Sequence, residues 1–198
     1  MKKIMFNEEY GLQRAVLDKR KTMTRRMVPV GTLAKAKAMS QTHGKNEESY
    51  IRYYSYYKVG DKVAIAQRYS ELSEELIYES DDTLKVKQSA FEKGWRNKMY
   101  VNAELMPHHI RITNVKVEHL QDITEEDCLR EGIQEYFPYI DRDPNDRLRT
   151  FQYFKNGKIR FRRSPATECF ANLIDEISGK GTWESNPLVY VYEFELID

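Results

Sequence analysis

Alternation of large apolar side chains is clearest in the stretch Leu188-Val189-Tyr190-Val191-Tyr192-Glu193-Phe194-Glu195-Leu196. Successive side chains of a β-strand point to opposite faces, so every second residue of this stretch shares one face. That face carries Leu188, Tyr190, Tyr192, Phe194 and Leu196. The pattern therefore predicts a strand that covers the hydrophobic core with one face.

Earlier in the chain, three other stretches are predicted to form strands. Met1–Phe6 reads as a short strand, and Lys62–Ala66 as another that follows the turn residues Val59-Gly60-Asp61. Residues 109–118 form the third. Their apolar positions change parity near Thr113-Asn114, so we expect a β-bulge there.

Helix signals separate these strands. Three helices are predicted: residues 8–18 after the cap Asn7, a short helix between the cap Thr124 and Gly132, and a longer one from Ser164-Pro165 to Gly179. Residues 29–58 and 134–163 lack this periodicity and are interpreted as two long insertions in a single domain of residues 1–198. The mixture predicts an α+β fold, a mixed sheet or small barrel flanked by helices. Regular βαβ alternation is missing, which argues against a doubly wound nucleotide-binding fold.

The charge of the chain is balanced overall and uneven locally. Its 198 residues are 40% hydrophobic and 32% charged, with a net charge of +1, so a polycation that coats nucleic acid is excluded. Two segments without any acid are the candidates for local affinity: residues 19–26 with five cationic side chains and residues 147–163 with seven.

Membrane and metal signals are weak. No apolar run approaches the ~20 residues of a membrane helix, so we expect a cytoplasmic protein without membrane contact. Cys128 and Cys169 stand alone in predicted helices and are interpreted as reduced packing residues. His108-His109 would point to opposite faces of a strand, so no metal site and no cofactor is predicted.

The segment Lys21-Thr22-Met23-Thr24 follows the first predicted helix and combines an ammonium group with two hydroxyls. Common catalytic signatures are missing elsewhere, which leaves this segment as the main candidate for chemistry. In a straight strand Lys21 would point away from Thr22 and Thr24, so a shared site requires a turn after the helix. A solvated basic turn is the simpler interpretation.

Several ordered pieces of the chain resemble one known family. They are Asp18-Lys19-Arg20-Lys21-Thr22-Met23-Thr24-Arg25-Arg26, Val59-Gly60-Asp61-Lys62-Val63, Arg111-Ile112-Thr113-Asn114-Val115, Leu120-Gln121-Asp122-Ile123-Thr124-Glu125-Glu126-Asp127, Arg130-Glu131-Gly132-Ile133, Trp183-Glu184-Ser185-Asn186-Pro187 and Tyr192-Glu193-Phe194. Together they resemble the ASCH domains of the PUA-like superfamily, in particular small phage and prophage proteins. The resemblance implies a PUA-like pseudobarrel with a cleft used for RNA or modified nucleosides.

One related branch hydrolyses N4-acetylcytidine, and its catalytic positions match Lys21, Thr24 and Glu131. The resemblance implies Lys21 as base, Thr24 as nucleophile or water-positioning hydroxyl, and Glu131 as proton carrier, without a metal. An ion pair between Lys21 and Glu131 is the simpler structural interpretation. A carboxylate usual in phage relatives is replaced within Ala64–Tyr69, where Gln67 could hydrogen-bond a base edge.

The sequence leaves three functions open. The first is binding of RNA or a modified nucleoside or nucleotide through a basic cleft around Lys21–Arg26, the second is the amidohydrolase, and the third is a phage accessory protein that binds another protein. Candidate ligand-binding residues are Thr22, Arg25, Arg26, Gln67, Arg68, Tyr69, Arg111, Arg160 and Arg162. The tyrosines of residues 50–57 stack bases or, more simply, pack the insertion. Residues 147–163 suit both a nucleic-acid surface and a hairpin turning at Asn156-Gly157.

Overall fold

The computed structural model describes residues 1–79, 83–136, 149–163 and 165–198. Its strands are β1 (Lys2–Ile4), β2 (Met23–Met27), β3 (Lys62–Ile65), β4 (His109–His119), β5 (Gln134–Tyr136), β6 (Thr150–Lys155), β7 (Lys158–Arg163) and β8 (Leu188–Leu196). Its α-helices are α1 (Leu12–Leu17), α2 (Val30–His43), α3 (Glu47–Tyr53), α4 (Glu74–Ile77), α5 (Gln88–Arg96), α6 (Glu125–Arg130), α7 (Ala166–Ser178) and α8 (Thr182–Ser185). Short 3-10 helices are η1 (Tyr69–Glu71), η2 (Lys98–Tyr100), η3 (Ala103–Leu105) and η4 (Leu120–Asp122). The expected α+β class is confirmed.

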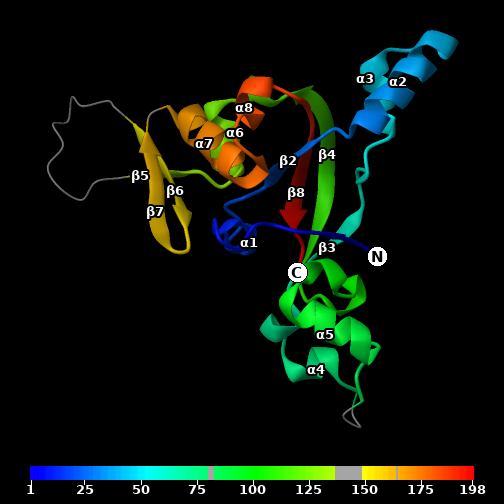
Figure 1. Cartoon of the computed structure of the whole chain (residues 1–198), viewed down its shortest axis with the longest axis vertical. Helices are drawn as coiled ribbons and strands as arrows, with labels where there is room; N and C mark the ends of the chain where they lie inside the picture. Colours follow the sequence, from blue (N-terminus) through cyan, green and yellow to red (C-terminus); the bar gives the residue numbers. More distant parts are fainter. Residues whose placement is uncertain (80–82, 137–148, 164) are drawn as a thin grey trace, which may run out of the picture.

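The central sheet has five strands in the order β1-β3-β4-β8-β2 (Figure 1). Among the described strands of this sheet only β1 and β3 pair in parallel, so the sheet is mixed. Of the two expected architectures, a mixed sheet or a small barrel, the mixed sheet is found. The barrel is not closed, because β1 and β2 remain the two edges and do not pair within the described residues. Across that opening the side chain of Arg26 donates to the carbonyl of Met5 over 2.6 Å, in place of a backbone ladder.

Both faces of the sheet are buried, each against different helices. On β8, Tyr190, Tyr192 and Phe194 belong to one hydrophobic core, which also contains Ile51 of α3. Val189 and Val191 belong to a second core, which packs on α6 and α7. Figure 1 shows α6, α7 and α8 on one side of the sheet and the hairpin of α2 and α3 projecting from the other. The alternation predicted for 188–196 therefore separates two cores.

The strand over 109–118 is confirmed as β4, and its register with β8 shifts between Ile112 and Asn114. The expected bulge is therefore present. It follows from the change of parity, since without an extra residue Val115 would leave the core that Ile112 enters.

Helix boundaries agree with the sequence in part. Thr124 caps α6 by accepting from the amide of Asp127, as expected. The first helix is shorter than predicted: it begins at Leu12 after Gly11, whose φ is 66°, instead of after Asn7. Asn7 accepts from the amide of Glu9 and so stabilises the turn before the helix.

The last long helix, α7, ends at Gly179 as expected. Pro165 occupies the cap position of this helix instead of its first helical position, and the expected cap Ser164 lies outside the described residues.

The two insertions contain regular structure. Residues 29–58 hold the helices α2 and α3, the second capped by the side chain of Asn46. The part of 134–163 that the structure describes forms a separate sheet in the order β5-β6-β7. Its hairpin turns at Asn156 and Gly157, both with positive φ, and this confirms the turn expected there.

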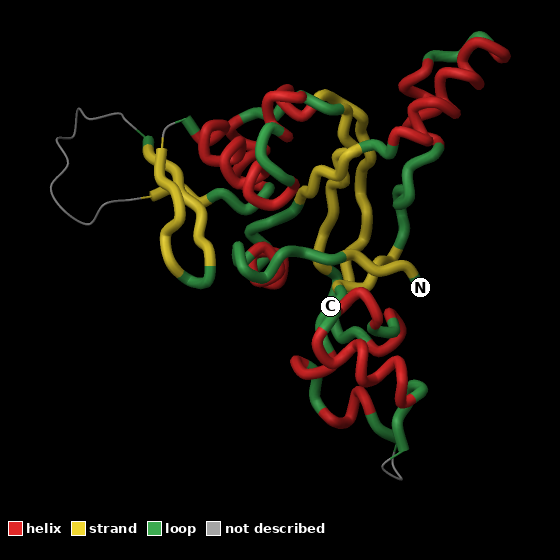
Figure 2. Tube along the Cα trace, viewed as in Figure 1, coloured by secondary structure: helices red, strands yellow, loops and turns green. Residues whose placement is uncertain are grey.

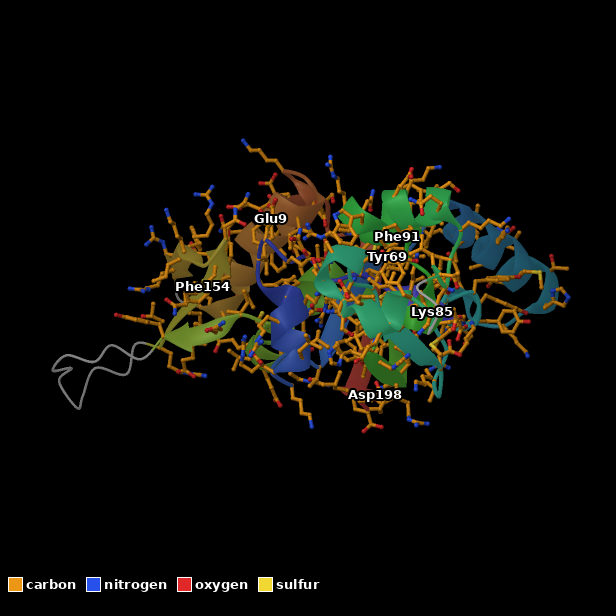
Figure 3. The ribbon with its side chains drawn as sticks, turned by 90° about the horizontal axis from the view of Figure 1, so that it is seen from below. Glu9, Tyr69, Lys85, Phe91, Phe154 and Asp198 are labelled. Atoms are coloured by element: carbon orange, nitrogen blue, oxygen red, sulfur yellow. The ribbon has the colours of Figure 1, made fainter. Side chains whose placement is uncertain are left out.

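A third region, residues 69–106, has no counterpart in the sequence prediction. Its described residues, 69–79 and 83–106, form a lobe of helices and turns beyond one end of the sheet (Figure 2). Its core includes Tyr69, Ile77 and Met106. Tyr69 is fully buried and stacks on Phe91 with ring centroids 5.7 Å apart (Figure 3).

Both cysteines are free and buried, Cys128 in α6 and Cys169 in α7, where they pack in the second core. Within the described residues, none of the helices combines the length and the apolar character that crossing a bilayer demands.

Candidate functional site

The turn after α1 directs Lys21 toward the sheet. Lys19 has a φ of 59°, the amide of Lys19 donates to Val16, and the amide of Arg20 donates to Ala15, both over 2.9 Å. This is the Schellman pattern that ends a helix. The amide of Lys21 also donates to Ala15, so the chain reverses tightly before entering β2.

Helix α6 ends in the same way. Gly132 has a φ of 110°, its amide donates to Leu129, and the amide of Ile133 donates to Cys128. A Cβ at Gly132 would lie 3.1 Å from a side-chain atom of Leu12 and 3.8 Å from one of Lys21. Glycine thus meets the backbone demand of the turn and lets the ends of α1 and α6 pack closely.

These two helix ends bring Lys21 and Glu131 into contact. The Nζ atom of Lys21 donates to Oε2 of Glu131 over 2.6 Å and to its backbone carbonyl over 2.7 Å. Lys21 is 2% exposed and Glu131 5%. Burial lowers the pKa of Lys21, and the neighbouring carboxylate of Glu131 acts in the opposite direction. The expected ion pair is present, and it is enclosed.

Arg25 extends this pair into a larger cluster. Its guanidinium donates to Glu118 over 2.6 Å, to Asp127 over 3.0 Å and to Glu131 over 3.1 Å. Burial by itself would lower the pKa of Arg25. The neighbouring carboxylates, of which Glu131 has the largest effect, raise this pKa above its usual range. We call Lys21, Arg25, Glu118, Asp127 and Glu131 the buried charge network. The guanidinium of Arg25 is therefore bound by carboxylates inside the protein.

The two threonines of the basic segment lie outside this network. Thr22 accepts a hydrogen bond from Arg130 over 3.3 Å, and its amide donates to the carbonyl of Arg130. Thr24 pairs with Tyr192 across β2 and β8 and is therefore on the sheet face opposite to Arg25. Within the described residues no hydrogen bond links Thr24 to Lys21 or Glu131.

A basic pocket of about 560 Å³ lies between the segment after β1, strand β2 and the lobe. Its cationic residues are Arg26, Arg68, Arg96 and Lys98, and its acidic residues are Glu8 and Glu9. Glu8 pairs with Arg68 and, over 2.7 Å, with Lys98. Among the described residues, neither Arg26 nor Arg96 pairs with a carboxylate. These two guanidinium groups are consequently available to an anion.

Lys98 is the most enclosed cation of the basic pocket. Its Nζ atom donates to Glu8, to Gln13 and to the carbonyl of Phe6. Burial lowers the pKa of Lys98 to about 8, against the opposing effect of Glu71 and with the help of Arg68 and Arg26. Its charge is therefore sensitive to mild alkaline pH.

A second cavity, of about 420 Å³, adjoins β2 on the face of Thr24. We call it the tyrosine pocket, because its lining includes Tyr54, Tyr56, Tyr57, Tyr190 and Tyr192. Arg26 lines this pocket as well as the basic pocket. The two cavities thus share one lining residue, Arg26.

The other candidate residues are dispersed. Gln67 is buried, and its Oε1 atom has no hydrogen-bond partner among the described residues. Tyr69 belongs to the core of the lobe and accepts from the amide of Asn102. Arg111 lies on β4, 3.7 Å from Glu195. On β7, Arg160 pairs with Glu176, and Arg162 donates to Gln152 and stacks on the ring of Tyr136.

The sequence thus identified part of the site and missed part. Arg26 and Arg68 share the basic pocket, and Lys21, Arg25 and Glu131 share the network. Arg96 and Lys98 were missed, because no local pattern marks a lobe residue as a neighbour of β2. A signal did exist for Tyr190, since its alternation with Tyr192 places both on the face of Thr24.

Among the described residues, no group of three or more histidine, cysteine, aspartate and glutamate side chains has the arrangement of a metal site.

Comparison of this chain with models of protein families, with curated proteins and with solved structures finds no match.

Proposed function

We propose that this protein binds single-stranded RNA or a nucleotide, with the phosphate in the basic pocket. The observation that carries the proposal is the convergence of four cations on one cavity: Arg26 from β2, Arg68 just before η1, Arg96 from α5 and Lys98 from η2. Guanidinium groups bind phosphate oxygens through paired N–H donors. The sequence resemblance to ASCH domains supports the same function.

The balance of charge within the pocket favours an anionic ligand. Glu8 already neutralises part of the charge of Arg68 and Lys98 and holds both side chains in place. Arg26 donates to the neutral carbonyl of Met5, and Arg96 is exposed. A phosphate would supply the missing negative charge beside these two arginines.

The test is the affinity for a fluorescein-labelled single-stranded oligoribonucleotide, measured by anisotropy at several salt concentrations. Affinity should fall steeply with salt, and Arg26→Gln/Arg96→Gln should weaken binding and reduce the slope of log K against log salt by about 2. The matched control is Lys35→Gln/Lys37→Gln on α2, which removes the same charge away from the pocket. Absent or salt-independent binding by the wild-type protein would contradict the proposal.

An amidohydrolase is the second candidate, and the enclosed Lys21 favours it. A lysine whose pKa is lowered by burial loses its proton more readily and serves better as a base. In that reaction water would cleave N4-acetylcytidine to cytidine and acetate, with Thr24 and Glu131 in the roles named above. Thr24 would first have to approach Lys21. Chromatography of N4-acetylcytidine incubated with the folded protein tests this, and no cytidine above the rate without protein would remove the candidate.

A further inference from the structure

The tyrosine pocket is built from two distant parts of the chain. Tyr54, Tyr56 and Tyr57 follow helix α3, whereas Tyr190 and Tyr192 lie on the interior strand β8. Tyr57 and Tyr192 meet edge to face with ring centroids 5.1 Å apart, and Tyr56 meets Tyr57 at 4.9 Å. Three of these rings are fixed by burial: Tyr57, Tyr190 and Tyr192 are 8%, 4% and 1% exposed. The wall of the pocket is therefore largely preformed.

The polar ends of two rings are engaged outside the cavity. The hydroxyl of Tyr57 donates to the carbonyl of Lys3 over 2.7 Å, and that of Tyr190 donates to the carbonyl of Ile51 over 2.8 Å. Burial raises the pKa of Tyr192 to about 12 and also raises the pKa of Tyr57. These rings therefore stay neutral near pH 7 and line the cavity without a negative charge.

Arg26 connects this aromatic wall to the basic pocket. On β2 it pairs with Tyr190 of β8, and its guanidinium donates to Met5 at the edge of the basic pocket. A ligand that contacts Arg26 from the tyrosine pocket thus has cationic groups on one side and aromatic rings on the other. A nucleotide has this division, since an aromatic base is joined through a ribose to an anionic phosphate.

We infer that the tyrosine pocket holds the base of a nucleotide whose phosphate is bound by Arg26 and the basic pocket. The inference rests on the proposed function and adds the position of the base. Stacking on aromatic side chains accommodates every base, because each has a π face. The ligand class is therefore a nucleotide unit, free or within a single strand.

Tyr56 offers a test that spares the core. It is 63% exposed at the mouth of the pocket, so Tyr56→Leu removes an aromatic ring without opening a buried cavity. Tyr53→Leu is the matched control, because Tyr53 is 71% exposed and lines a different cavity, beside Lys58.

The experiment is calorimetric titration with the four ribonucleoside 5′-monophosphates, the matching nucleosides and ribose 5-phosphate. At least one nucleotide should bind more tightly than its nucleoside and than ribose 5-phosphate. Tyr56→Leu should weaken that nucleotide about fivefold or more and leave ribose 5-phosphate unchanged. Tyr53→Leu should match the wild-type protein.

The outcomes separate the two proposals. If nucleotides bind and Arg26→Gln weakens them while Tyr56→Leu does not, the base site is overturned and the phosphate site stands. If nucleosides bind and depend on Tyr56 while ribose 5-phosphate and RNA do not bind, the base site stands and the phosphate site fails. If no compound of the series binds, the inference is overturned.

Discussion

Lys21 contacts Glu131 twice, through the carboxylate at 2.6 Å and through the backbone carbonyl at 2.7 Å. The second contact places the ammonium group at the C-terminal end of α6, where an unpaired carbonyl benefits from a cation. Both side chains are almost fully buried, so the pair joins two helix ends that the sequence separates by more than a hundred residues. The ion pair consequently has a structural role, which is to hold the ends of α1 and α6 together.

Removing both members of this pair should destabilise the protein less than the sum of the two single removals. Lys21→Met leaves the carboxylate of Glu131 with Arg25 alone, and we expect a loss of roughly 3 kcal/mol in the free energy of unfolding. Lys21→Met/Glu131→Gln should be more stable than the sum of the two single changes predicts. Urea denaturation of the four proteins measures this coupling. Additive losses would show that the ion pair contributes nothing of its own.

Glu193 should carry part of the acid sensitivity of the fold. Burial would raise the pKa of Glu193, but hydrogen bonds from Arg130 and Lys116 outweigh it and lower the pKa to about 2. A carboxylate with a depressed folded pKa stabilises the protein above its unfolded pKa, and this contribution is lost as the pH falls toward 2. Glu193→Gln should therefore lower stability by roughly 2 kcal/mol at pH 7 and flatten the acid limb below about pH 4. Thermal melts of the wild-type protein and of Glu193→Gln between pH 7 and pH 2 measure this. If the two melting temperatures fell in parallel with pH, Glu193 would not contribute to the acid sensitivity.

Binding of a phosphate ligand should weaken in mild alkali because of Lys98. This lysine is protonated below a pKa of about 8, so its positive charge is lost as the pH rises through that value. We expect nucleotide affinity to decline between about pH 7 and 9. Lys98→Arg keeps its charge over this range and should remove most of the decline. An equal decline in both proteins would assign the effect to another group.

Gly94 should not tolerate a side chain. A Cβ at this position of α5 would lie 2.4 Å from the ring of Tyr69, which is fully buried. Gly94→Ala should therefore cost about 1–3 kcal/mol through overpacking. Gly31→Ala in α2 is the matched control, because a Cβ there meets nothing within 4 Å, and it should be neutral or stabilising. Equal stability of the two variants would contradict the packing described for the lobe.

Local signals in the sequence predicted the elements that depend on local chemistry. Alternation identified β8, the change of parity identified the bulge after Ile112, and the pair Thr124 and Gly132 marked both ends of α6. The start of α1 was missed because Asn7 stabilises a turn, and an asparagine cap has the same sequence signature.

Contacts between residues that are far apart in the chain could not be predicted from local sequence signals. The lobe buries Tyr69, Ile77, Val101 and Met106, whose spacing follows neither a helix nor a strand period. Glu118 and Asp127 read as ordinary polar residues of a strand and a helix, yet they enclose Arg25. The basic pocket could not be predicted for the same reason, because Lys98 donates to Glu8, a residue ninety positions earlier in the sequence.

The most direct measurement is the position of a bound nucleotide in a crystal grown with 5-bromouridine 5′-monophosphate. We expect an anomalous bromine peak within the tyrosine pocket, against Tyr57 or Tyr192, and phosphate density beside the guanidinium of Arg26. A bromine peak on another surface, such as the hairpin of β6 and β7, with no density beside Arg26, would contradict it.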